Sequence, residues 1–248
     1  MIVEFIGSTG AGKTTLIGEV KNRLWKTNRV TTSIDLALSL LGLKGITNPT
    51  LQNLVMEFVS LPVFIWVFYK YNQFIRYTIK LFWRKTGFSI QSVHNLRSLV
   101  RKIGMYEITK RLGTDQIILV DEGPILAAHM FVSTETTYTD EEIARFTDLL
   151  PLPDLAIYIH ASVDTIIKHT TGRGDPPREV DIKNQAQMKA YIEHTVAMFD
   201  LLVQAKNIRP QLLVVESLDF SGAGFNQVVD NVCQAILARS PIKSNQSK

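Results

Sequence analysis

Cysteine is nearly absent from this sequence: Cys233 is the only one in 248 residues. A single thiol cannot form an intramolecular disulfide, and it cannot build a zinc site made of cysteines. The histidines at positions 129, 160, 169 and 194 show none of the spacings typical of metal ligands, and we interpret them as structural. The sequence therefore excludes a disulfide-stabilised scaffold, and we expect a reducing compartment, the cytoplasm.

Long hydrophobic runs and strong net charge are also lacking. The most apolar stretch, residues 61–69, is interrupted by Pro62 and followed by Lys70, so it is shorter than the ~20 residues of a bilayer span. The first residues lack the basic segment of a signal peptide. The formal net charge of +4 favours anionic ligands, but it is too small to predict nucleic-acid binding. We expect a soluble protein with small-molecule ligands.

Five short, apolar, β-branched runs are each followed by a longer helical pattern. Such near-continuous hydrophobicity is typical of strands that are covered on both faces of a parallel sheet. Strands alternating with helices predict the α/β class. The predicted strands are residues 2–6, 29–34, 116–120, 155–159 and 211–215.

The segment between the second and third predicted strands, residues 35–115, is too long for one crossover and predicts a helical insert. Several helices are expected there, two of them at 64–83 and 92–111, with Pro62 at the start of the first. Residues 1–240 are predicted to form a single domain with this insert, and the polar residues 241–248 a flexible tail.

A glycine-rich loop follows the first predicted strand and matches the pattern G-x-x-x-x-G-K-[ST]. Gly7 and Gly12 allow backbone conformations in which successive N–H groups point at phosphate oxygens. Lys13 is placed to reach the outer phosphates, and the Thr14 hydroxyl to bind Mg²⁺. The pattern therefore predicts a P-loop that binds Mg-ATP. The residues predicted to contact the nucleotide are Gly7, Ser8, Thr9, Gly10, Ala11, Gly12, Lys13, Thr14 and Thr15.

Two carboxylates, Asp121 and Glu122, end the third predicted strand. Ligands of open parallel sheets collect beyond the carboxyl ends of the strands. If this strand lies beside the first, Asp121 points toward the Mg²⁺ and Glu122 toward the reacting centre. Either carboxylate is a candidate catalytic base, and the sequence leaves the choice open.

A basic segment with glycines and prolines follows the fourth predicted strand. Lys168, Arg173 and Arg178 cluster around the point where Gly and Pro are expected to end the helix, and Ser162 is a candidate N-cap of that helix. Arginine forks suit phosphoryl oxygens, so this segment predicts a lid whose arginines, Arg173 and Arg178, contact the phosphates of the nucleotide.

These features, in this order, resemble the thymidylate kinase and deoxynucleoside kinase group of P-loop phosphotransferases. The resemblance implies a five-stranded parallel sheet in the order 2-3-1-4-5 with helices on both faces. It also implies Mg-ATP as the donor, an acceptor hydroxyl or phosphate under the lid, and Lys13 and Arg173 as the groups that stabilise the transferred phosphoryl group. Residues 216–222 would lie near the base.

The chain departs from that group at one position of the third strand. Those kinases usually carry Asp-Arg or Glu-Arg there, whereas Asp121 is followed by Glu122 and Gly123. The identity of the acceptor therefore stays open. Asp35, Arg97 and Arg101 in the insert are candidate contacts for it.

The insert also has a basic helical pattern, since Arg76, Lys80 and Arg84 are spaced four residues apart. Such a pattern is typical of a solvated face, and the alternative is contact with an anionic membrane or partner. A homodimer is a further alternative that the sequence does not test.

The leading prediction is a small-molecule kinase that transfers the γ-phosphoryl group of ATP. The alternative is an ATPase that couples hydrolysis to partner binding or conformational change, because Glu122 could activate water instead of an acceptor. A third hypothesis is a nucleotide-binding partner protein that does not turn the nucleotide over. No Asn-Lys-x-Asp run suggests a guanine site.

Overall fold

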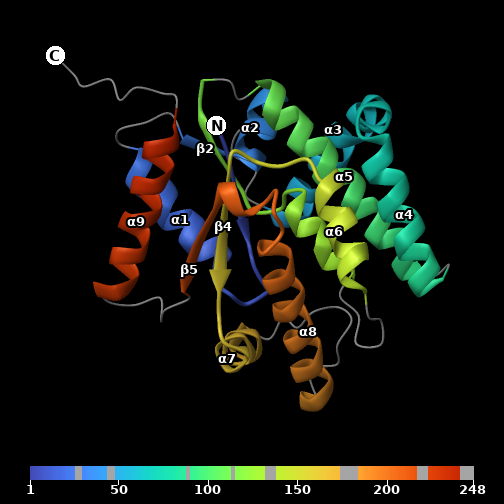
Figure 1. The fold of residues 1–248 in the computed structure, drawn as a ribbon. Helices are drawn as coiled ribbons and strands as arrows, with labels where there is room; N and C mark the ends of the chain where they lie inside the picture. The colour runs from blue at the N-terminus through green and yellow to red at the C-terminus, as the bar shows by residue number, and fades with distance from the viewer. Residues whose placement is uncertain are drawn as a thin grey trace.

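The computed structural model describes residues 1–25, 30–43, 48–87, 90–112, 115–131, 138–173, 184–216 and 223–240. Its centre is a parallel sheet of five strands in the order β2-β3-β1-β4-β5 (Figure 1), which confirms the expected order. The strands are β1 (Ile2–Ile6), β2 (Val30–Thr32), β3 (Ile117–Val120), β4 (Leu155–His160) and β5 (Leu212–Glu216).

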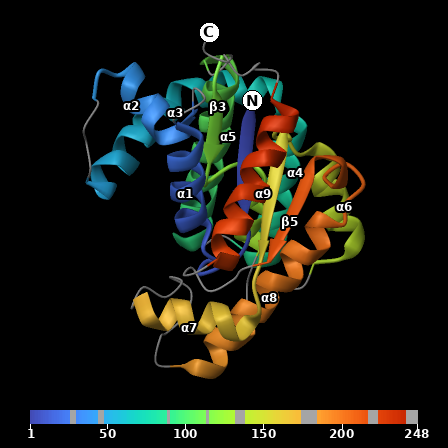
Figure 2. The same cartoon turned by 90° about the vertical axis from the view of Figure 1, so that its left-hand side faces the viewer.

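Helices cover both faces of this sheet. α1 and α9 lie on one face, whereas α3, α4, α5 and α6 lie on the other (Figures 1 and 2). α7 lies beyond the carboxyl end of β4, close to α8. None of the described helices combines the length and the apolarity that a membrane span requires. The helices are α1 (Lys13–Trp25), α2 (Ser33–Leu40), α3 (Pro49–Lys70), α4 (Asn72–Thr86), α5 (Ile90–Leu112), α6 (Asp140–Leu149), α7 (Val163–Arg173), α8 (Gln185–Val203) and α9 (Ala223–Arg239), with 3₁₀ turns η1 (Ile125–Phe131) and η2 (Arg209–Gln211).

The central strands are completely buried, as their continuous hydrophobicity predicts. Every residue of β1 and of β3 is buried, and the core side chains Val3 and Phe5 have no exposed surface. Burial on both faces removes the need for polar residues at alternate positions. Glu4 is the one charged residue in β1 and is also buried.

The second predicted strand is shorter than expected. β2 ends at Thr32, and residues 33 and 34 belong to α2. The Thr32 hydroxyl accepts a hydrogen bond from the Asp35 N–H at 3.1 Å and so caps α2. A threonine at this place favours both a strand and an N-cap, and the local cap decides the boundary.

The prediction of one helix over 64–83 is wrong. The structure has two helices there, and Tyr71 separates α3 from α4. Pro62 lies inside α3, and the proline that starts this helix is Pro49, where a missing N–H is harmless. The predicted helix at 92–111 is confirmed as α5.

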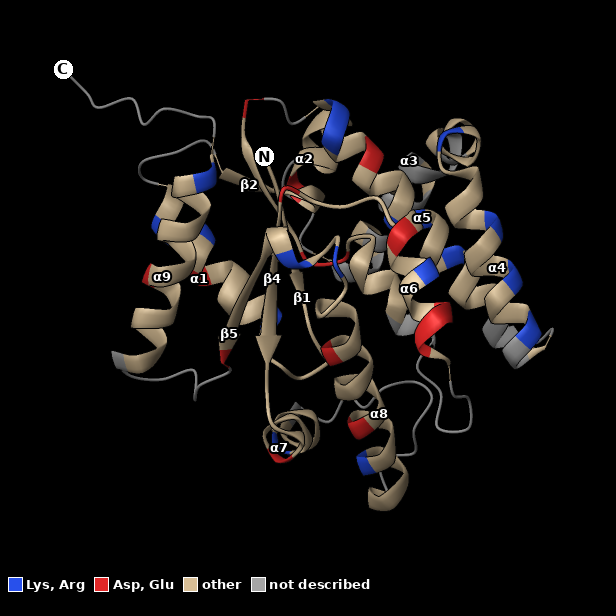
Figure 3. Ribbon diagram, in the orientation of Figure 1, with Lys and Arg blue, Asp and Glu red and all other residues tan. Residues whose placement is uncertain are grey.

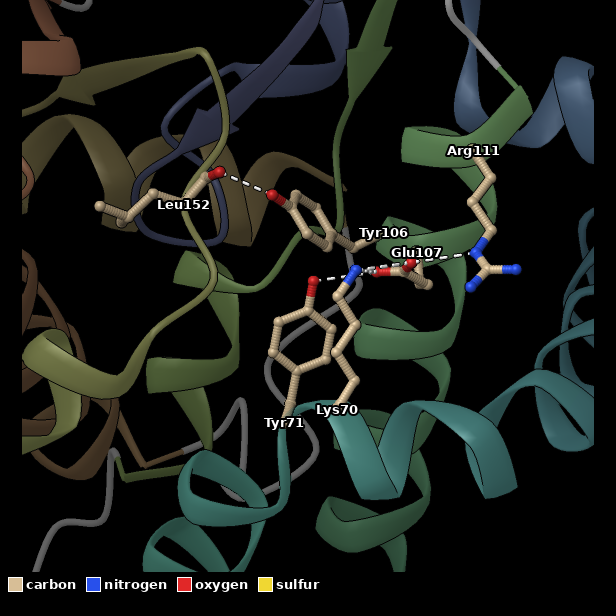
Figure 4. Close-up of polar contacts among 6 residues, drawn as sticks. All are labelled: Lys70, Tyr71, Tyr106, Glu107, Arg111 and Leu152. Carbon is tan, nitrogen blue, oxygen red and sulfur yellow. Dashed lines mark hydrogen bonds and ion pairs between the residues drawn. The ribbon is translucent and has the colours of Figure 1, made fainter.

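One buried carboxylate ties the junction between α3 and α4 to α5 (Figure 4). Glu107 accepts hydrogen bonds from the Lys70 ammonium at 2.9 and 3.0 Å, the Tyr71 hydroxyl at 2.9 Å and Arg111 Nε at 3.1 Å. Burial alone would raise the pKa of Glu107, but these hydrogen bonds lower it below its usual value. The neighbouring Tyr106 hydroxyl donates to the Leu152 carbonyl at 2.6 Å, just before β4. α5 is therefore bonded both to the rest of the insert and to the segment that leads into β4.

The predicted basic pattern lies on the outside of α4. Arg76, Lys80 and Arg84 are exposed, and basic positions follow one side of this helix (Figure 3). Arg84 forms an ion pair with Glu142 of α6. On the opposite side, Ile75 is buried in the core, so α4 is amphipathic.

Candidate functional site

The glycine loop joins β1 to α1 at the carboxyl end of the sheet. Gly7, Gly10 and Gly12 have φ angles of 140°, 89° and 95°, which residues with a β-carbon rarely adopt. A β-carbon at Gly7 would also lie 2.7 Å from the Ile159 carbonyl oxygen of β4. The loop can therefore approach its neighbours and a ligand closely only because these positions are glycine.

The P-loop lysine points back at its own loop. The Lys13 ammonium donates to the carbonyl oxygens of Gly7 at 2.9 Å and Ser8 at 3.0 Å. These two carbonyl oxygens keep the Lys13 ammonium group beside the loop. Lys13 opens α1, so the positive end of the helix dipole lies at the same place.

The P-loop and the acidic strand end meet as predicted. β3 pairs with β1, and the Thr14 hydroxyl donates to an Asp121 carboxylate oxygen at 3.2 Å. Burial raises the pKa of Asp121, while the Lys13 charge and the Thr14 hydrogen bond oppose that rise. A partly buried carboxylate and a hydroxyl therefore lie together next to an ammonium group.

Glu122 forms an ion pair with Arg101 of α5. The Arg101 side chain is 19% exposed and that of Glu122 is 51% exposed, so the pair lies at the edge of the site. The structure thus brings Glu122, a candidate catalytic residue, into contact with Arg101, a candidate contact of the acceptor molecule. Arg97 lies one helical turn before Arg101 and is exposed.

Asp35 lies on another part of the same edge, in the first turn of α2. Its carboxylate accepts a hydrogen bond from the Lys21 ammonium of α1 at 2.6 Å. Burial would raise the pKa of Asp35, but the Lys21 and Thr32 hydrogen bonds lower it. The described contacts of Asp35 are therefore with α1 and β2, not with Asp121 or Glu122.

The predicted lid is described only in part. Ser162 caps α7 as expected, because its hydroxyl accepts the Thr165 N–H at 3.2 Å. Glycines and prolines were expected to end this helix; α7 runs from Val163 to Arg173 and includes Gly172, and the prolines that follow lie outside the described residues. The Arg173 side chain, Arg178 and most of residues 216–222 lie outside the described residues, so their predicted roles stay predictions.

Sequence reasoning missed that α7 contacts the P-loop directly. A His169 ring nitrogen is 2.9 Å from the Gly10 carbonyl oxygen, and a β-carbon at Gly10 would lie 2.8 Å from the Thr170 hydroxyl. The helix that precedes the predicted lid therefore packs against the glycine loop. No local pattern could have shown this contact, since 159 positions separate the two residues along the chain.

The described residues contain no group of three or more His, Cys, Asp or Glu side chains arranged to hold a metal ion. His160, which we interpreted as structural, lies 2.9 Å from a Glu216 carboxylate oxygen. This hydrogen bond raises the pKa of His160 above its usual value, while burial acts in the opposite direction.

Comparison with known proteins gives a match in structure only. No protein-family model and no curated protein sequence matches this chain. A deoxyadenosine kinase from M. mycoides, solved with the products dCMP and a flexible dCDP, is 12% identical; the match covers 96% of this chain and 100% of that one, with a TM-score of 0.50. A shikimate kinase from Acinetobacter baumannii in complex with shikimate is 14% identical over 97% of this chain and 94% of that one, with a TM-score of 0.44. The sheet order, the P-loop and the first of these matches identify the fold of this chain as that of the P-loop kinases.

Proposed function

We propose that this protein is a kinase that transfers the γ-phosphoryl group of ATP to a small-molecule acceptor. One observation carries the proposal: the Thr14 hydroxyl and the Asp121 carboxylate are in contact beside the P-loop lysine. Phosphoryl transfer needs little covalent chemistry from a protein, because positioning and charge neutralisation supply most of the catalysis. The contacting hydroxyl and carboxylate, and the ammonium group that acts on the carboxylate, are of the kinds that meet those needs.

The residues at this edge fit a magnesium ion. Burial disfavours the charged form of Asp121, and a bound cation would offset that effect. Thr14 and Asp121 offer the oxygen ligands that Mg²⁺ prefers. The ion would neutralise charge on the nucleotide phosphates.

The roles of the other residues follow from their positions. Lys13 would exchange its two carbonyl partners for phosphate oxygens when ATP binds. Glu122 or Asp121 would accept the proton of an attacking hydroxyl. Arg101, beside Glu122, would contact the acceptor, and Arg173 and Arg178 would close over the phosphates. A nucleoside or nucleotide is the acceptor class suggested by the M. mycoides kinase, whose products include dCMP.

The experiment measures ADP release from Mg-ATP by the purified protein, with and without nucleosides, nucleotides, sugars and lipid carriers. ADP release that depends on an acceptor is expected. Lys13→Ala is predicted to lower the rate by about 100-fold or more, because it removes a cation that acts on the transferred group. Lys206→Ala, an exposed lysine in the turn before β5, is the matched control and should leave the rate unchanged.

Two results would contradict the proposal in different ways. ADP release that no acceptor increases would favour the ATPase alternative, with Glu122 acting on water. Undiminished turnover in Lys13→Ala would show that the nucleotide site lies elsewhere.

A further inference from the structure

Glu4 is a carboxylic acid in the middle of the central strand. It pairs in the sheet with Val120 of β3 and Ala156 of β4, and it has no exposed surface. One carboxylate oxygen accepts a hydrogen bond from the Leu126 N–H at 2.9 Å. The other oxygen is buried and has no hydrogen-bond partner among the described residues. Burying a carboxyl group with an unpaired oxygen costs free energy, so a specific interaction must explain its position here.

The reason lies in the turn between β3 and η1. Glu4 accepts a hydrogen bond from the Leu126 N–H, and the Ile125 backbone also lowers its pKa; these two residues begin η1, two residues after the Asp121–Glu122 pair. The two N–H groups are among those that a 3₁₀ turn leaves without an internal partner. The carboxyl group therefore fixes the backbone that leads away from the two acids.

Gly123 makes room for this carboxyl group. A β-carbon at Gly123 would lie 2.5 and 2.7 Å from the two Glu4 carboxylate oxygens, closer than such atoms approach in proteins. The turn that follows Asp121 and Glu122 thus passes directly over Glu4. The glycine that follows Asp121 and Glu122 therefore has a physical reason in this chain.

Lys102 of α5 is a buried residue that interacts electrostatically with these carboxyl groups. It is 9% exposed, and burial lowers its pKa, while Glu122, Glu4 and Asp121 oppose that effect. The preceding residue, Arg101, pairs with Glu122, so this part of α5 lies beside the turn.

We infer that Glu4 is a positioning residue for the proposed phosphoryl transfer: it holds the turn that sets the orientation of Asp121 and Glu122, and Gly123 leaves the space for its carboxyl group. The inference rests on the proposed function. The described hydrogen bond of Glu4 is with the backbone of this turn, so we place its effect in the turn and not in a direct contact with the nucleotide or the acceptor.

The first test does not depend on activity. Amide hydrogen exchange at Leu126 and Ile125 is measured in the wild type, Glu4→Gln and Glu4→Ala. Glu4→Gln keeps an acceptor oxygen and should preserve protection, whereas Glu4→Ala should speed exchange at both amides about tenfold. Equal exchange in all three proteins would overturn the inference, whether or not the protein is a kinase.

The second test uses the steric relation between Gly123 and Glu4. Gly123→Ala and Glu4→Ala are each expected to lower kcat about 10- to 100-fold while the Kd for Mg-ATP changes less than about threefold, because the P-loop is untouched. The double variant should have the kcat of Glu4→Ala alone, since without the carboxyl group the added methyl meets no obstacle. Glu4→Gln should retain kcat within about threefold of the wild type.

Glu107→Gln is the control, because the described hydrogen bonds of this buried carboxylate are with Lys70, Tyr71 and Arg111 and not with this turn. It should leave kcat unchanged even where it lowers Tm. Additive losses in the double variant, or an equal fall of kcat in Glu107→Gln, would reduce Glu4 to a stabilising residue and overturn the inference. Loss of ATP binding in every protein, including the wild type, would instead contradict the proposed function.

Discussion

At the scale of single residues, the charged groups of this protein are governed by burial as much as by their partners. Burial raises the pKa of Glu4 from 4.5 to about 8, and the backbone hydrogen bonds only partly oppose it. Between these two values the folded protein holds a proton that the unfolded chain has released. The free energy of unfolding should therefore fall as the pH rises through this range and level off above it.

Glu4→Gln tests this at the same scale, because the amide is neutral at every pH. Measured by urea unfolding from about pH 5 to about pH 9, the variant should gain stability relative to the wild type as the pH rises. Glu193→Gln, at an exposed position of α8, is the control and should show no such trend. A difference between Glu4→Gln and wild type that stays constant over this range would mean that Glu4 titrates alike in the folded and unfolded chains.

At the scale of elements, the sequence predicts the features that depend on neighbouring residues along the chain. It does not predict contacts between segments that are far apart in the sequence. The sheet was predictable because buried parallel strands are continuously apolar, and the P-loop because its chemistry needs fixed residues at fixed spacing. The break at Tyr71 was missed because the apolar pattern runs through it. The contacts of Glu4 with the turn after β3 and of α7 with the P-loop join residues more than 100 positions apart, and no local pattern indicates such pairs.

The contact between α7 and the P-loop gives a prediction for these two elements. Gly10→Ala adds a methyl group 2.8 Å from the Thr170 hydroxyl at a position with φ of 89°. It should weaken Mg-ATP binding about tenfold, by displacing either the loop or α7. Isothermal titration calorimetry measures the change.

Gly42→Ala is the matched control for this substitution. Gly42 has φ of 69°, but a β-carbon there would meet nothing within 4 Å. The backbone strain of about 1 kcal/mol is then shared by both variants, and only Gly10→Ala should lose nucleotide affinity. Equal affinities in the two variants would show that α7 does not constrain the loop.

At the scale of the whole molecule, α5 decides whether the insert and the sheet behave as one unit. Glu107 of this helix binds Lys70 and Tyr71 at the junction of α3 and α4, while the adjacent Tyr106 is bonded to Leu152 before β4 (Figure 4). Displacing the insert would therefore disturb the sheet as well. The prediction of a single domain over 1–240 corresponds to a single cooperative unfolding transition.

Two probes compare the insert with the whole chain. Tryptophan fluorescence reports mainly on the insert, because two of the three tryptophans, Trp66 and Trp83, lie there. Far-ultraviolet circular dichroism reports on all helices and strands. The two signals should give the same urea midpoint. Glu107→Gln should lower both midpoints together and reduce the free energy of unfolding by about 1–3 kcal/mol. The loss is limited because Lys70 and Arg111 are partly exposed, and water replaces some of the lost interaction. Glu193→Gln, whose partner Lys189 is exposed, should change stability by less than about 0.5 kcal/mol. Separate midpoints in the wild type would mean that the insert unfolds alone, and the bonds through α5 would then be too weak to make one domain of the chain.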